Sequence, residues 1–91
     1  MNSREISTLP FVYCDLNAAM TDTGYLLTNG SRESLAQLGL SEEQALGLEF
    51  RFGDGELLFS GVISYHPTFG YLADARTPVV DWPSDMPMDL P

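Results

Sequence analysis

The clearest pattern of apolar and polar positions lies in the second half of the chain. Residues 48–52 alternate Leu and Phe with Glu and Arg, which predicts a strand with one buried and one solvated face. Residues 53–56 read Gly-Asp-Gly-Glu, the composition of a hairpin turn. The run 57–65 is the predicted return strand. Its two faces are Leu57, Phe59, Gly61, Ile63 and Tyr65 on one side and Leu58, Ser60, Val62 and Ser64 on the other.

Further elements follow this hairpin. A turn bounded by Pro67 and Gly70 precedes a third expected strand at 71–73. Gly61 in the middle of the return strand indicates a bulge or a bend, as barrels use at their corners. Residues 79–80 are expected to add an edge strand, and Trp82 to anchor on the core.

The first half of the chain has weaker signals. Strands are expected at 11–16 and 25–28, with a turn-rich linker at 17–24 between them. Ser31 is expected to be the N-cap of a short helix that Gly39 terminates. Ser41 and Gln44 fit a capping box, which predicts one further helical turn over 41–46.

Together these elements predict an α+β fold. We expect a small antiparallel β-sheet or a partly open β-barrel of about five short strands, with one or two short helices. A chain of 91 residues is sufficient for one domain. Residues 1–82 are expected to form that β-rich domain, and 83–91 a flexible, acidic, proline-rich tail.

One local resemblance accompanies this pattern. Residues 35–43 followed by 48–52 resemble a segment of the swapped-hairpin barrels of bacterial transition-state regulators, where a short helix ending in Leu-Gly-Leu precedes a strand. Those proteins bind DNA as dimers. Because this chain lacks the basic residues that such binding needs, we do not assign it to that family and transfer no functional residue from it.

The charge of the chain restricts its partners. Thirteen Asp and Glu residues face four Arg, there is no Lys, and the formal net charge is −9. Such a surface repels phosphate backbones and anionic lipids, so direct binding to nucleic acid or membrane is not expected. It attracts a basic protein, although an acidic surface also serves solubility alone. The absence of Lys excludes Schiff-base chemistry and a phosphate-binding lysine on this chain.

The sequence contains few candidate catalytic residues. The single cysteine, Cys14, and the single histidine, His66, would be the only thiol–imidazole pair, and a cysteine in an apolar strand is usually inert. These two residues are too few for a structural zinc site. We therefore expect no catalytic residues, no metal and no cofactor. With no signal-peptide pattern and no possible internal disulfide, a cytoplasmic location is expected.

Two segments remain as binding candidates. Residues 57–73 carry no formal charge and include Phe59, Tyr65, Phe69 and Tyr71. The second face of this hairpin is covered either by a partner or second copy, or by the helix of the same chain. Near the C-terminus, acidic and apolar side chains alternate in a manner typical of segments that fold onto a basic groove, or of an ordinary frayed terminus. The relevant side chains there are Asp81, Trp82, Asp85 and Asp89.

These observations favour a non-enzymatic protein-binding module, a small acidic inhibitor or adaptor that acts on a basic partner protein. In a sharper form of this hypothesis, the chain is a phage-type inhibitor whose carboxylates imitate the phosphates of a nucleic acid. The alternative is a self-associating β-protein, a homodimer joined through 57–73.

Overall fold

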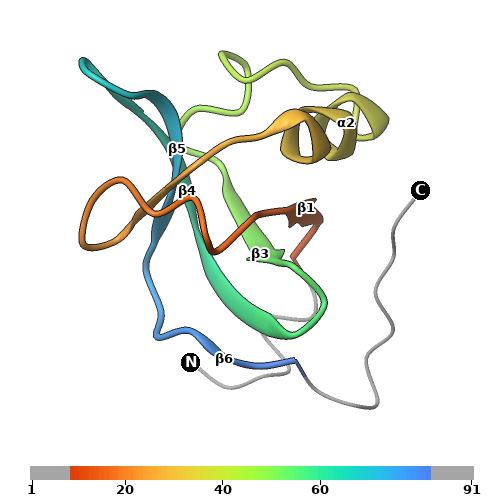
Figure 1. Ribbon diagram of the computed structural model, residues 1–91. Helices are drawn as coiled ribbons and strands as arrows, with labels where there is room; N and C mark the ends of the chain where they lie inside the picture. Colours follow the sequence, from red (N-terminus) through yellow and green to blue (C-terminus); the bar gives the residue numbers. More distant parts are fainter. Residues whose placement is uncertain (1–8, 83–91) are drawn as a thin grey trace.

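The computed structural model describes residues 9–82, which form a strongly curled six-stranded sheet with one helix against it (Figure 1). The elements, in chain order, are β1 (Phe11–Tyr13), β2 (Gly24–Leu26), α2 (Asn29–Gln37), β3 (Glu49–Gly53), β4 (Leu57–His66), β5 (Gly70–Ala75) and β6 (Val80–Asp81). This is the expected small α+β fold, and its sheet is open. Within 9–82 no helix is long and apolar enough to cross a membrane.

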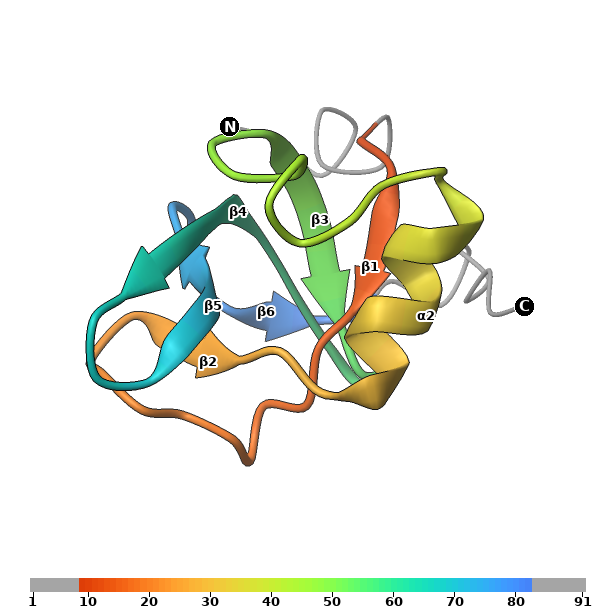
Figure 2. The same ribbon diagram turned by 90° about the horizontal axis from the view of Figure 1, so that it is seen from above.

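The strand order is β1-β3-β4-β5-β2, and β6 pairs with β4 off this path. The strands β3, β4 and β5 form the antiparallel meander that the alternating pattern predicts. The predicted sheet was antiparallel, and the structure departs from this at one edge, where β1 runs parallel to β3. After β1 the chain crosses to the far edge of the sheet at β2, and it returns through α2 to enter β3 in the direction of β1 (Figure 2).

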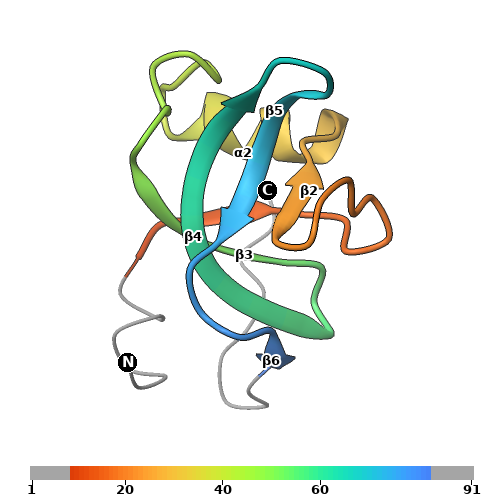
Figure 3. The ribbon, with the colours of Figure 1, turned by 90° about the vertical axis from the view of Figure 1, so that its left-hand side faces the viewer.

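The main core lies between the sheet and α2, which covers one face of the sheet (Figure 3). Leu35 of the helix joins Val12, Phe52 and Phe59 there, and the two Phe side chains, which are cross-strand partners, stack at 5.3 Å between ring centroids. The predicted face of β4 that includes Phe59 and Ile63 is thus the core face. Adjacent aromatic pairs of this kind stabilise a sheet beyond the area they bury.

The opposite face of the sheet is partly covered by the chain's own C-terminal strand. Trp82 meets the Phe11 ring edge-on at 5.4 Å, and the Arg51 guanidinium lies 5.5 Å from the centroid of the same ring. Leu58, which pairs with Val80 of β6, is fully buried. Neither of the two alternatives, a partner or the helix, is needed to bury Leu58. Trp82 anchors on the sheet as predicted.

Gly61 marks the expected bend in β4. A Cβ at this position would overlap the backbone carbonyl of Asp74 on β5, so only glycine permits the two strands to approach this closely. Next to it, the hydroxyl of Thr77 accepts the N–H of Ser60 at 2.9 Å, and Arg76 N–H donates to the Ser60 carbonyl at 2.9 Å. β5 leaves β4 at this point, which makes room for β6.

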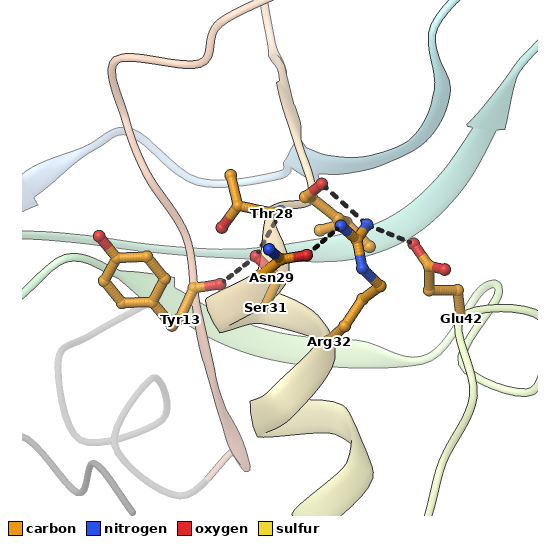
Figure 4. A network of polar contacts seen from close by, with 7 residues as sticks. Tyr13, Thr28, Asn29, Ser31, Arg32 and Glu42 are labelled. Carbon is orange, nitrogen blue, oxygen red and sulfur yellow. Dashed lines mark hydrogen bonds and ion pairs between the residues drawn. The ribbon is translucent and has the colours of Figure 1, made fainter.

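The helix begins before Ser31, contrary to the N-cap prediction, because Thr28 is the N-cap. Ser31 is buried, and its hydroxyl accepts the Thr28 N–H at 3.1 Å and donates to the Tyr13 carbonyl at 2.7 Å (Figure 4). Ser34, one turn later, accepts the Tyr13 N–H at 3.1 Å. The hydrogen bonds of these two serines attach α2 to the outer edge of β1.

The chain after the helix follows the predicted capping chemistry. Gly39 has a positive φ of 77°, as a helix-terminating glycine requires. Gln44 N–H donates to the Ser41 hydroxyl at 3.2 Å, and the Gln44 side chain accepts the Ser41 N–H at 2.9 Å. This capping box closes a turn over 42–45 and does not start a further helix.

Candidate partner-binding surface

The structure separates the aromatic residues of the predicted binding hairpin into core and surface. Phe59 is fully buried, with Phe52 on one side and Tyr25 at 5.2 Å between ring centroids on another. Its assignment to a partner-binding surface is therefore wrong, because the chain's own side chains enclose it. Tyr71 is half-buried and packs against the same core.

The exposed aromatic residues lie at the β4–β5 hairpin tip. Tyr65 is 60% exposed and Phe69 is 40% exposed. The His66 ring lies beside Phe69, with 4.8 Å between centroids, and its Nδ1 accepts the Thr68 N–H at 3.0 Å. Since Nδ1 acts as an acceptor here, the imidazole side chain serves to order the turn on which Phe69 is displayed.

Two leucines beside this hairpin were not predicted as surface residues. Leu48 was assigned to a buried strand face, yet it is 45% exposed, and Leu46 is 40% exposed. Leu46 bridges to Ile63 of β4, and the Gly47 N–H donates to the Ile63 carbonyl at 2.9 Å. This segment and the hairpin tip both lie at the upper end of the molecule in Figures 1 and 3. We call Leu46, Leu48 and Tyr65 the hairpin-tip patch. Phe69 is not part of it, because Phe69 stacks on His66, whose side chain points to the face of β4 opposite to that of Tyr65.

A signal for this patch existed in the sequence. Leu46 and Leu48 flank Gly47, whose φ of 79° reverses the chain direction before β3 begins. Apolar residues on both sides of a left-handed glycine lie in a turn, where burial is less complete than in a strand. Exposed apolar side chains that gather in one place are a common feature of interaction sites.

The C-terminal candidates divide differently. Asp81 is exposed, whereas Trp82 is half-buried against Phe11 and so has a structural role in the sheet. Asp85 and Asp89, with the whole predicted tail 83–91, lie outside the described residues.

The arginines within 9–82 are all held against the chain itself. Arg32 donates to the Asn29 side chain at 2.7 Å and to the Leu27 carbonyl at 3.3 Å, and it lies 3.6 Å from the Glu42 carboxylate (Figure 4). Arg76 lies 3.8 Å from the Asp74 carboxylate, and Arg51 is buried over Phe11.

Many carboxylates have no such contact. Across residues 9–82, several exposed acidic side chains make no hydrogen bond or ion pair. They are Asp22, Glu33, Glu43, Glu49, Glu56 and Asp81. Because the arginine side chains contact groups of the chain itself, the electrostatic field outside this part of the protein is dominated by negative charge.

A cavity of about 240 Å³ lies beneath Arg32, lined also by Leu35, Leu40, Ser41 and Glu42. An arginine in a cavity suggests an anion site, but here Glu42 and the acceptors of Asn29 and Leu27 already surround the guanidinium. A carboxylate beside the arginine repels a second anion, so this cavity does not have the chemistry of an anion-binding site.

Cys14 and His66 occupy different environments. Cys14 is fully buried in the main core, and His66 belongs to the hairpin tip with its Nδ1 engaged by backbone amides. Burial, and then the carboxylates of Asp15 and Asp54, raise the pKa of the Cys14 thiol to about 12. Among the described residues, no group of three or more His, Cys, Asp and Glu side chains is placed to hold a metal ion.

We expect the Cys14 thiol to resist alkylation in the native protein. At pH 8 almost none of a thiol with a pKa near 12 is present as the thiolate, and the Cys14 side chain is also buried. Iodoacetamide should therefore react with the native protein at least about a hundredfold more slowly than with the protein in denaturant. Mass spectrometry of timed samples measures the two rates. Rapid labelling of the folded chain would contradict this prediction.

The same pKa shift predicts that stability depends on pH. Because the Cys14 thiol ionises at a lower pH in the unfolded chain than in the folded one, the free energy of unfolding should fall as the pH rises from 9 towards 12.

Comparison of the chain with protein-family models, with curated proteins and with solved structures gave no match in any of the three.

Proposed function

We propose that this chain is a non-enzymatic binding module for a basic protein, an acidic inhibitor or adaptor. The observation that carries the proposal is the uneven use of charge: the arginines of 9–82 are engaged within the chain, whereas six exposed carboxylates are not. An acidic surface of this kind speeds encounter with a cationic partner and repels nucleic acid. In the sharper form of the proposal, the partner's own ligand is a nucleic acid whose phosphates the carboxylates imitate.

The test begins with immobilised chain and an extract of the source cells. Captured proteins are identified by mass spectrometry, and the purified partner is then titrated against the chain at low and high salt. We expect a basic partner whose dissociation constant rises about tenfold or more between ~0.05 and ~0.5 M salt, because salt screens exposed charges. Salt-independent affinity, or direct binding of the chain to DNA or RNA, would contradict the proposal. Competition between the chain and DNA for the partner tests the mimicry.

Self-association is the second candidate, and the exposed apolar side chains at the hairpin tip favour it. Mutual repulsion between copies of net charge −9 opposes it. Sedimentation velocity at micromolar concentration distinguishes the two: a monomer supports the binding module, and a dimer that strengthens with salt supports self-association.

A further inference from the structure

At both ends of the strand order, the chain itself covers part of the edge. At β1, the outward N–H and C=O groups of Tyr13 bond to the hydroxyls of Ser34 and Ser31. At β2, the Leu26 N–H donates to the Ala18 carbonyl at 2.9 Å. Unpaired backbone groups at a sheet edge are a template for another chain, and the groups named here are already paired.

A third edge lies along β4, where β3 stops. Glu49, the first residue of β3, pairs with Val62, and the last backbone contact on this side is from Gly47 N–H to the Ile63 carbonyl. Alternate residues of a strand direct their backbone groups to the same side. The N–H and C=O of Tyr65 therefore point as those of Ile63 do, away from β5.

Two further observations agree with this orientation. Tyr71, the β5 partner of Tyr65, directs its carbonyl to the Leu27 N–H on the β2 side, as expected for a pair that exchanges no hydrogen bonds between β4 and β5. Apart from the bonds of the strand ladders, no hydrogen bond within residues 9–82 involves the backbone of Tyr65. The edge is short, because Pro67 has no N–H to offer.

The surroundings of this edge are apolar and acidic. The hairpin-tip patch supplies the apolar side chains, including Tyr65 itself. Glu43 and Glu49 bracket the segment 46–48 in sequence, and both are exposed without a partner within 9–82. Glu49 pairs with Val62, so its side chain lies on the face of the sheet opposite to Tyr65. A strand that lies here therefore meets apolar contacts on one face and the negative charge of Glu49 on the other.

We propose that the partner of this chain binds through an extended, basic segment that adds to β4 beside Tyr65. The segment accepts the Tyr65 N–H and donates an N–H to the Tyr65 carbonyl. Its apolar side chains contact the hairpin-tip patch, and its Lys or Arg side chains face Glu43 and Glu49. A second copy of this chain is a poorer occupant, because it brings the same carboxylates to the same place. This inference rests on the proposed function and specifies the partner's conformation.

The probe is a synthetic peptide of about seven residues, the length of an ordinary strand, that alternates lysine with valine and has blocked ends. Its counterpart carries N-methyl groups on the internal amides, which keeps charge and side chains but removes donors and prevents close strand pairing. Both peptides are titrated into the full chain and followed by fluorescence anisotropy and by ¹⁵N–¹H NMR. We expect N-methylation to weaken binding by about tenfold or more, from the loss of backbone hydrogen bonds. Amide exchange at Tyr65 should slow when the unmodified peptide is bound.

A matched pair of variants separates local from overall charge. Glu43→Gln with Glu49→Gln removes the carboxylates beside the edge, and Glu33→Gln with Glu56→Gln removes the same charge from α2 and the β3–β4 turn. We expect the first variant to weaken peptide binding several-fold more than the second.

Each result decides a different point. Equal binding of the two peptides, with strong salt dependence, would overturn strand addition and leave the proposed function standing. No binding of the unmodified peptide, or no effect at Tyr65, would also overturn the inference. A dimer of the chain alone with a protected Tyr65 amide would show that a second copy occupies the edge, again overturning it.

Discussion

Replacement of Phe59 by alanine is expected to lower the free energy of unfolding by about 3–5 kcal/mol, the range for truncation of a buried Phe. The ring is fully buried between Phe52 and Tyr25, so the substitution removes apolar burial and leaves a cavity in the main core. Urea unfolding followed by circular dichroism measures the change. If the substitution is too destabilising for the protein to be isolated, Phe59→Leu, which leaves a smaller cavity, provides a measurable value of the same sign.

The matched control is Tyr65→Ala on the same strand. Tyr65 is 60% exposed and makes an edge contact with Tyr71 at 5.2 Å, so its loss should cost about 1 kcal/mol or less. The two variants thus separate stability from binding within one hairpin. A large loss for Tyr65→Ala together with a small loss for Phe59→Ala would contradict the arrangement described for β4.

Ser31→Ala is expected to cost about 2–4 kcal/mol, because it leaves two backbone groups without their partner. The Ser31 hydroxyl satisfies the Thr28 N–H and the Tyr13 carbonyl at once, and the side chain is fully buried. Removing it weakens the start of α2 and its attachment to β1 together. Denaturant unfolding measures the total effect.

Ser41→Ala is the control for Ser31→Ala. Ser41 also accepts a backbone N–H three residues later, but it is exposed, and water can replace the lost hydroxyl. We expect a cost of about 0.5–1 kcal/mol, at the lower end for capping residues. Equal costs at both serines would show that the bond to Tyr13 contributes nothing.

Local patterns predicted the parts of the fold that local physics determines. The alternation over 48–52 and 57–65 identified the central hairpin and its core face, and Gly61 indicated the bend. The Ser41–Gln44 capping box was also visible, since both partners lie within one turn. The start of α2 was missed because Ser31 fits the N-cap preference as well as Thr28 does. Only the contact with Tyr13, distant in sequence, shows its different role.

The candidate surface was harder to predict, because alternation identifies two faces and does not say how far each is covered. Phe59 and Tyr65 share one face of β4, yet the core ends between them. Leu58 lies on the other face and is buried because β6 returns to it from over twenty residues later in the chain. Leu46 and Leu48 precede β3, and Leu46 bridges to Ile63 of β4. Their exposure likewise depends on where β3 begins along β4, which local alternation does not determine.

The contact between Phe11 and Trp82 has a consequence for the order of folding. It joins β1 to the residue that follows β6, and the parallel pairing of Phe11 with Arg51 also spans much of the sequence. Contacts between neighbouring strands of the meander close short loops and form quickly, whereas these long-range contacts must wait for larger loops to close. During synthesis, β1 leaves the ribosome before the tryptophan that packs against it, so we expect β1 to complete its packing late in folding.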